Sequence, residues 1–409
     1  MSDANARAIA AVGFVLLIAL AWAMSSDRRH VPWRAVVWGI GLQLGLAGLL
    51  LLTDVGGWFF AAMGGVIDLL ARVTDAGVIF LFGKLVEANS FAISVLPIIV
   101  VMGSLFAVLY HLGIMQRVVD VLGMLLARTM GTSGAESLAA VANIFLGMTE
   151  SALVVRPYLV RMTQSEIFSL MTVGMASVAG SVLVAYSKML GKEYAGHLAT
   201  ASLLSAPAGL LIAKVMVPER ERPLTTSGGG HVEVERTATN VFDAAAHGAV
   251  EGMRLAAYVG AMLIAFVALI ALVNEGLGAL GAPFGYEGLS LQRVLGFFFA
   301  PFAFLMGIPW QDAQQVGGLL GIKTVLNEFI AYQELAVLAE QGALAPRSIA
   351  ITSYALCGFA NFGSLAILLG GLGGLVPSRR EEIARFGLRS IAAGTLSSFM
   401  TACVAGMLL

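Results

Sequence analysis

The chain has 409 residues, of which 58% are hydrophobic and 12% are charged, about half the charged share of a typical soluble protein. A soluble globule and a disordered chain are excluded, because both need many more polar and charged residues. The 24 basic and 25 acidic residues nearly cancel, so no positive field is present to bind nucleic acid. Long unbroken apolar runs exclude a transmembrane β-barrel and predict an all-α polytopic membrane protein.

The N-terminal part contains two predicted spans, each close to the ~20 residues that cross a bilayer. They cover Ala6–Met24 and Ala35–Leu52. Arg28, Arg29 and Arg34 lie in and beside the turn between them. This turn is expected on the cytoplasmic side, because positive loops stay inside. The N-terminus is then extracytoplasmic.

The next stretch alternates between clean spans and broken segments. Trp58–Arg72 is apolar on one face but carries glycines and charges, which favours a helix lying in the membrane interface. Phe91–Leu112 is a third span, and Met115–Arg156 is too rich in charged and small residues to be one. Phe168–Leu190 and Leu198–Val217 are predicted to be spans again.

A long polar loop, Pro218–Asn240, divides the chain. Asn240 is expected to cap an amphipathic helix that follows the loop. The remaining elements are a span, two more broken segments, an interrupted apolar region and a final span: Leu255–Val273, Arg293–Ile308, Val316–Leu338, Leu344–Val376 and Phe386–Leu409.

Two interrupted regions share one pattern, an Ala-Asn pair followed by glycine and hydroxyl residues and a renewed apolar run. They are Val141–Leu153 and Ala355–Leu368. Leu344–Val376 has 33 residues, and two half-helices of ~14 residues reach only about 21 Å each. This is too short to cross the bilayer twice, so the length predicts a re-entrant hairpin. Paired interrupted segments indicate a transporter with its site near the midplane.

Two carboxylates, Glu150 and Glu328, are flanked by apolar runs, where a charge is costly and usually functional. In a competing interpretation, each lies at a helix end or pairs with a lysine such as Lys323. With Thr149, Asn327, Asn361 and Ser364 they predict a site rich in hydroxyl and amide groups, which suits a neutral polyhydroxylated solute. Thr149 and Ser364 could instead act only as helix N-caps.

A second group of oxygen donors suits a small hard cation at unwound helices. The group consists of Asn143, the carbonyl of Leu146, Ser177 and the carbonyl of Val178. The competing interpretation makes Asn143 an ordinary residue at a hairpin tip.

Three motifs resemble the signatures of the concentrative nucleoside transporters: GMTES at Gly147–Ser151, NEF at Asn327–Phe329 and GFANFGS at Gly358–Ser364. The resemblance implies a bacterial family member in the inner cell membrane. It implies a homotrimer whose protomers have about eight transmembrane helices, two re-entrant helical hairpins and interfacial helices. A scaffold would surround a mobile transport domain that drives nucleoside uptake with Na⁺ or H⁺.

Carried onto this chain, the resemblance divides the residues by role. Hairpin 1 would face the nucleobase through Gly147, Met148, Thr149 and Glu150, and Val182 would line the base pocket. The ribose would be held by Asn327, Glu328, Asn361 and Ser364, with Phe359 packed near the ligand. The Na⁺ ligands would be Asn143, the Leu146 carbonyl, Ser177 and the Val178 carbonyl.

The same resemblance implies five parts of the chain. They are the N-terminal spans and interfacial helix, mainly scaffold (1–112); the first half of a transport core with hairpin 1 (113–217); the polar loop and amphipathic helix (218–254); a scaffold span and connecting segment (255–315); and the second half of the core with hairpin 2 and the last span (316–409).

The leading hypothesis is a Na⁺-coupled symporter that imports nucleosides such as uridine by alternating access. Many family members have Gln where this chain has Met148, and Gly-Met at this pair accompanies acceptance of purine nucleosides. The alternatives are a proton-coupled carrier that uses Glu150 or Glu328, a passive channel and an intramembrane enzyme. The enzyme hypothesis needs a nucleophile–base pair or a metal motif, which the sequence lacks.

Overall fold

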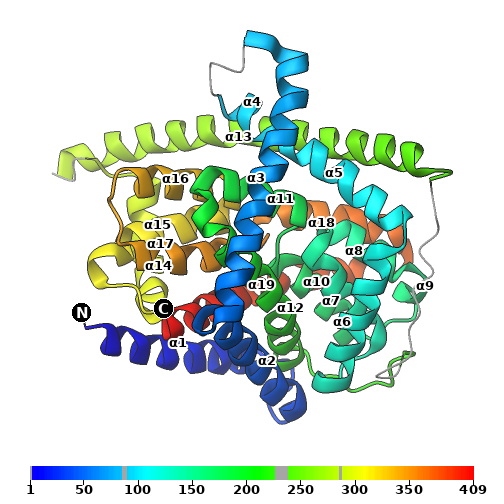
Figure 1. Cartoon of the computed structure of the whole chain (residues 1–409). Coiled ribbons are helices and arrows are strands. Elements are labelled where there is room, and N and C mark those ends of the chain that lie inside the picture. Colours follow the sequence, from blue (N-terminus) through cyan, green and yellow to red (C-terminus); the bar gives the residue numbers. More distant parts are fainter. Residues whose placement is uncertain (1, 85–89, 226–237, 285–287) are drawn as a thin grey trace.

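The computed structural model describes residues 2–84, 90–225, 238–284 and 288–409, and within these ranges it contains helices and no strand (Figure 1). Seven helical stretches in these ranges are long and apolar enough to cross a membrane, or eight if one sharply bent helix pair counts as a single span. The all-α membrane fold that the sequence predicts is confirmed.

The first three helices agree with the predicted elements. α1 (Asp3–Ala23) and α2 (Trp33–Leu52) match the first two spans. α3 (Asp54–Phe82) has 29 residues and extends beyond the predicted interfacial helix at both ends. In Figure 1, α3 crosses the long helix α13 (Val241–Gly281) at a steep angle instead of running alongside it. Its interfacial position stays a prediction.

The first interrupted region forms the expected hairpin. α4 (Phe91–Ser94) and α5 (Leu96–His111) make up the third span, which α6 (Ile114–Met130) follows. α7 (Gly134–Phe145) and α8 (Met148–Val154) are separated by two residues and pack against each other. The short α9 (Arg156–Leu159) completes this part.

The span predicted at Phe168–Leu190 is broken in the middle. α10 (Gln164–Ala176) and α11 (Gly180–Leu190) are separated by three residues, Ser177–Ala179. The short η2 (Lys192–Tyr194) leads into α12 (Ala195–Met216), which matches the fifth predicted span.

After the polar loop, of which residues 226–237 lie outside the described ranges, one helix replaces two predicted elements. The amphipathic helix and the span at Leu255–Val273 are joined in the 41-residue α13. Asn240 caps it as predicted, accepting a 2.9 Å hydrogen bond from the Asp243 amide. The division after residue 254 therefore falls inside a continuous helix.

The second hairpin does not lie where the sequence predicts. After α13 come η3 (Ala282–Phe284), α14 (Leu291–Leu305), α15 (Trp310–Val325) and α16 (Glu328–Glu340). α15 and α16 pack against each other around Leu326 and Asn327. The hairpin tip thus carries the NEF motif, in a segment that the sequence only suggests to be broken.

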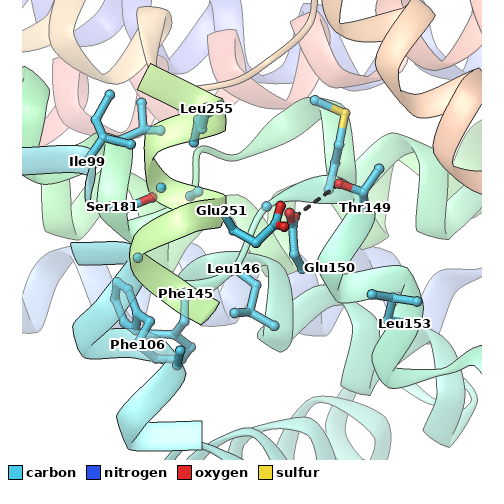
Figure 2. Close-up of a pocket in the computed structure, with 18 of the residues that line it drawn as sticks. Ile99, Phe106, Phe145, Leu146, Thr149, Glu150, Leu153, Ser181, Glu251 and Leu255 are labelled. Carbon is cyan, nitrogen blue, oxygen red and sulfur yellow. Dashed lines mark hydrogen bonds between the residues drawn. The ribbon is translucent and has the colours of Figure 1, made fainter. Parts of the chain in front are cut away.

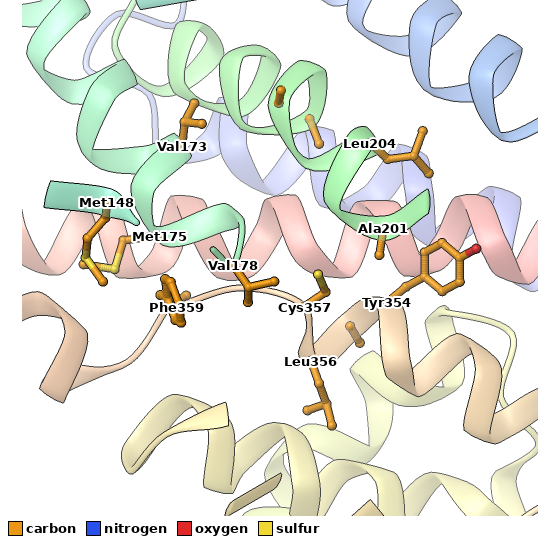
Figure 3. Packing of buried hydrophobic residues seen from close by; sticks show 14 of the residues in the cluster. Met148, Val173, Met175, Val178, Ala201, Leu204, Tyr354, Leu356, Cys357 and Phe359 are labelled. Carbon is orange, nitrogen blue, oxygen red and sulfur yellow. The ribbon is translucent and has the colours of Figure 1, made fainter. Parts of the chain in front are cut away.

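The predicted hairpin at Leu344–Val376 is a discontinuous helix. α17 (Pro346–Leu356) and α18 (Phe362–Leu375) make almost no contact with each other. The segment through Cys357 and Phe359 leads from one helix to the other, and the two helices point away from the break (Figure 3). The length argument was wrong because it considered only a double crossing, whereas two half-helices with an extended linker can cross once. η4 (Pro377–Arg379) and α19 (Arg380–Leu408) end the chain.

Burial separates inner from peripheral helices. The most apolar windows of α10–α11 and of α12 are 89% and 94% buried, whereas those of the α4–α5 span and α13 are only 22% buried. The exposed apolar faces of the peripheral helices are thus available to lipid. The inner helices surround the broken segments that carry the motifs.

Candidate functional site

A cavity of about 1900 Å³ lies between α5 and α13 on one side and α8, α11, α16 and α18 on the other. Figure 2 shows part of its lining, with Ile99 and Phe106 from α5 opposite Thr149 and Glu150 from α8. All ten residues predicted to bind substrate line this one cavity: Gly147, Met148, Thr149, Glu150, Val182, Asn327, Glu328, Phe359, Asn361 and Ser364.

Both carboxylate oxygens of Glu328, which lines the cavity, accept hydrogen bonds from neighbouring side chains. Its side chain is almost fully buried at the first turn of α16. One carboxylate oxygen accepts a 2.9 Å hydrogen bond from the Tyr186 hydroxyl, and the other accepts a 2.9 Å bond from Asn361 Nδ2. A helix N-terminus also favours negative charge. The carboxylate is therefore stabilised although it is buried away from water.

Asparagines cap α16 and α18, two of the half-helices that begin at the cavity. Asn327 Oδ1 accepts the Ile330 amide at 3.0 Å, and Asn361 Oδ1 accepts the Ser364 amide at 2.7 Å. The alternative that Thr149 and Ser364 serve as N-caps is therefore wrong. The N-cap of α8 is Gly147, and that of α18 is Asn361. The Thr149 hydroxyl donates to Glu150 at 3.1 Å.

Lys323 has a different partner from the one the competing interpretation gave it. Its fully buried ammonium donates a 2.8 Å hydrogen bond to the carbonyl of Ala355, in the last turn of α17. A cation at a helix C-terminus and an anion at a helix N-terminus each complement the helix dipole. Lys323 and Glu328 therefore stabilise opposite ends of half-helices at the centre of the molecule.

Glu150 folds back over the tip of the first hairpin. A Cβ atom on Gly147 would lie 2.3 Å from Glu150 Oε2, so a side chain here would require the Glu150 carboxylate to move. Glu150 itself is exposed to the cavity. In Figure 2 its side chain and that of Glu251 extend toward each other from α8 and α13.

The apolar part of the cavity is tightly packed. Met148 is 6% exposed and Val182 is 1% exposed. Figure 3 shows Met148 beside Met175 and near Phe359, within the buried hydrophobic cluster. Met148 lines the cavity and also packs against α10, where Gly174 leaves space for it.

The predicted cation ligands lie where two helices end. α7 ends at Phe145 and α10 at Ala176, so their last carbonyls and negative dipole ends meet. Asn143 Nδ2 contacts both the Val173 carbonyl, at 2.8 Å, and the Ser177 hydroxyl. Among the described residues its buried Oδ1 has no hydrogen-bond partner. An orphaned buried oxygen beside two helix C-termini fits a small hard cation.

Of the four predicted ion ligands, only Leu146 also lines the large cavity. Asn143, Ser177 and Val178 are buried behind it. The carbonyl of Ser177 accepts a 3.3 Å hydrogen bond from the Phe359 amide. This bond joins the break between α10 and α11 directly to the break between α17 and α18.

Sequence reasoning missed two tyrosines behind the cavity. Tyr186 and Tyr332 are fully buried, and their rings stack with centroids 4.2 Å apart. One signal could have indicated Tyr186, because it follows Val182 by four residues and so lies on the same face of α11. A tyrosine buried in an apolar span also needs a hydrogen-bond partner, and Glu328 is that partner.

Comparison with known families gives matches along most of the chain. Models for the N-terminus and C-terminus of Na⁺-dependent nucleoside transporters match residues 12–85 and 197–406. A gate model described as nucleoside recognition matches residues 92–193. The chain is 44% identical over 399 residues to the uncharacterised transporter YutK of Bacillus subtilis, covering 97% of this chain and 98% of that protein. It is 42% identical to the nucleoside permease NupC of Helicobacter pylori, covering 97% of this chain and 96% of the permease.

The fold is also that of a solved nucleoside-transporter relative. The inward-facing, substrate-bound structure of CNTnw has a TM-score of 0.92 and 43% identity, covering all (100%) of this chain and 98% of the relative. An outward-facing CNTnw structure also has a TM-score of 0.92 with 43% identity, covering 98% of this chain and 97% of that one. These homologues are transporters, not enzymes. The chain therefore belongs to the family of concentrative nucleoside transporters, multi-pass membrane proteins that the family models describe as Na⁺-dependent.

Proposed function

We propose that this protein is a Na⁺-coupled symporter that imports uridine and other nucleosides, purine nucleosides included. The proposal rests on one observation. Glu150, Glu328 and residues of all three motifs line the same cavity. A cavity with acceptors at one end and apolar walls elsewhere suits a ligand with a hydroxylated sugar and a flat base.

The sugar is held at the end of the cavity formed by α16 and α18. Glu328 uses one lone pair of each oxygen for Tyr186 and Asn361 and keeps others for ribose hydroxyl donors, because an ionised carboxylate offers about four acceptor sites. Asn327, Asn361 and Ser364 complete this end, and Phe359 packs beside the ligand.

The base is bound at the tip of the first hairpin. Thr149 and Glu150 offer polar groups that meet its edge directly or through water, and Gly147 allows close approach. Met148 and Val182 cover the ring. Because the thioether of Met148 selects by packing and not by hydrogen bonding, this wall accepts both pyrimidine and purine bases.

Sodium is the proposed coupling ion, bound by Asn143, the Leu146 carbonyl, Ser177 and the Val178 carbonyl. An ion there stabilises the ends of α7 and α10. It also fixes the Ser177 carbonyl, which accepts the Phe359 amide. Binding of the ion therefore orders the nucleoside site, and by reciprocity the nucleoside raises the affinity for the ion.

The remaining features of the proposal follow from the family. The protein works by alternating access, since its relative CNTnw adopts inward-facing and outward-facing states. We propose a homotrimer in the inner membrane with an extracytoplasmic N-terminus, which places the turn with Arg28, Arg29 and Arg34 in the cytoplasm.

The test is uptake of labelled uridine by proteoliposomes that contain the purified protein. An inward Na⁺ gradient should drive accumulation above equilibrium, and unlabelled adenosine should compete. A proton gradient in Na⁺-free medium should not drive it. Equal accumulation with protons alone would replace Na⁺ by H⁺ as the coupling ion, and equilibration without accumulation would indicate a channel.

A further inference from the structure

Tyr186 touches the proposed ribose site without lining the cavity. Its side chain is fully buried on α11, and its hydroxyl donates a 2.9 Å hydrogen bond to Glu328 Oε1. Asn361 Nδ2 donates to the other oxygen, also at 2.9 Å. The carboxylate is therefore held by one donor from each side, and its plane is fixed before any ligand binds.

The ring of Tyr186 is itself held rigidly. It stacks on Tyr332 with an interplanar angle of 22°, and it packs edge-to-face on Phe329 with centroids 4.8 Å apart. The Tyr332 hydroxyl donates to a different acceptor, the Ser353 carbonyl, at 2.6 Å. Two stacked tyrosines thus have equally buried hydroxyls, of which only one bonds to Glu328.

We propose that Tyr186 is a positioning residue that orients the Glu328 carboxylate toward the ribose hydroxyls and so contributes to discrimination between ribose and deoxyribose. This inference rests on the proposed function, because it requires Glu328 to accept ribose hydroxyls. Without the Tyr186 hydroxyl, only Asn361 holds the carboxylate, and rotation about its terminal torsion, which is a soft one, is less restricted. A bound ligand must then immobilise the Glu328 carboxylate, which costs conformational entropy. This cost applies only to ligands whose hydroxyl groups bond to the carboxylate.

The experiment compares binding of uridine and 2′,3′-dideoxyuridine to purified wild-type and Tyr186→Phe protein at saturating Na⁺. The variant keeps the ring and its stacking and loses only the hydroxyl. We expect uridine affinity to fall roughly 3- to 10-fold, the effect of one net hydrogen bond, while dideoxyuridine affinity changes little. The ratio of uridine affinity to dideoxyuridine affinity should therefore fall by the same factor.

Tyr332→Phe is the matched control, because it removes a hydroxyl of equal burial from the same stack. It should leave the affinity ratio unchanged even if it lowers thermal stability. If Tyr186→Phe weakens both ligands equally, or changes neither, Tyr186 does not position the carboxylate and the inference is wrong.

Glu328→Gln separates the two levels of the argument. If Glu328→Gln abolishes the preference for uridine over dideoxyuridine but Tyr186→Phe does not reduce it, only the inference about Tyr186 fails. If Glu328→Gln also leaves the preference intact, the ribose assignment in the proposed function fails. In the double variant, Tyr186→Phe should reduce the ratio no further, because both changes act through one carboxylate.

Discussion

A buried carboxylate persists in a membrane protein only where fixed donors replace the water it has lost. Glu328 meets this condition through Tyr186, Asn361 and the start of α16. Glu150 is not subject to this condition, because it stays exposed to the cavity, where it accepts a hydrogen bond from Thr149. The two carboxylates therefore differ in rigidity. In the proposed function, the rigid Glu328 binds the ribose, which is the same in all ribonucleosides, and Glu150 meets the edges of bases that differ among nucleosides.

Gly147 tests the role of Glu150. Gly147→Ala would place a Cβ atom 2.3 Å from Glu150 Oε2, so the carboxylate must move. We expect affinity for every nucleoside to fall roughly 10- to 150-fold, as for the loss of one hydrogen bond to a charged group. Competition binding with uridine and adenosine measures it.

Gly57→Ala is the control for Gly147→Ala, because a Cβ atom on Gly57 in α3 meets nothing within 4 Å. Unchanged uridine affinity in Gly147→Ala would mean that the observed position of Glu150 is unimportant for binding.

At the scale of elements, the N-terminal ends of α7 and α10 are held together by side-chain contacts. Each begins with a capping box, at Ser133 and Thr163. The Ser133 hydroxyl donates to Glu166 at 2.5 Å, and the buried Lys214 pairs with Glu136 at 2.8 Å. Because these contacts fix the register of the two helices, their C-terminal ends meet at the candidate ion site.

Asn143 links those C-terminal ends. Asn143→Ala should raise the Na⁺ concentration for half-maximal uptake several-fold, and uridine affinity at a fixed low Na⁺ concentration should fall by a similar factor because linkage is reciprocal. Na⁺-dependence curves of uridine uptake measure both effects.

Ser137→Ala is the matched control for Asn143→Ala, because Ser137 is buried on the same helix and donates to the Ser133 carbonyl at the opposite end. A Na⁺ dependence that is unaltered in Asn143→Ala, or altered equally in Ser137→Ala, would remove Asn143 from the ion site.

The elements also show which parts of this fold a sequence can predict. Composition and apolar runs predicted the spans, and the motifs predicted residues that line one cavity. The direction of the chain after a break was not predictable, because α16 after Asn327 and α18 after Asn361 start with the same cap. α16 turns back on α15 and α18 continues away from α17. Only packing with the rest of the molecule decides between these outcomes.

Long-range hydrogen bonds were equally inaccessible to sequence reasoning. Tyr186 and Glu328 are 142 residues apart, and Lys323 lies five residues before Glu328 but bonds to Ala355. Because Lys323 and Glu328 are close in the chain, the sequence suggested that they form a pair. In the structure each has its own partners, at helix ends whose dipoles complement its charge.

At the scale of the whole molecule, one wall of the cavity is built from closely packed backbones. A Cβ atom on Gly248 or on Gly252 of α13 would approach backbone atoms of α5 to 2.4 Å and 2.7 Å. Small residues spaced by four allow such close helix contacts in membranes. The α5–α13 wall is therefore rigid, and the opposite wall consists of half-helices with breaks at Ser177–Ala179 and at Cys357–Asn361. This contrast favours movement of the broken helices past a fixed wall.

Ser181 can report that movement. It lies at the start of α11, is partly exposed and lines the cavity (Figure 2). The two native cysteines, Cys357 and Cys403, are buried, so Ser181→Cys provides a single accessible thiol. If the cavity opens to one side at a time, a membrane-impermeant thiol reagent should label it from one side in any given state. Saturating Na⁺ with uridine should change the labelling rate several-fold as the population shifts.

The wild-type protein is the control for native-cysteine labelling, and Na⁺ without nucleoside separates the effect of the ion from that of the substrate. A channel would predict the opposite pattern, since a continuous pore exposes Ser181→Cys to both sides at once and at a rate that Na⁺ does not alter. Equal labelling from both sides, together with uptake that never exceeds equilibrium, would therefore exclude alternating access for this chain. One-sided labelling that responds to Na⁺ and uridine would show that access to the cavity changes with ligand occupancy, as alternating access requires.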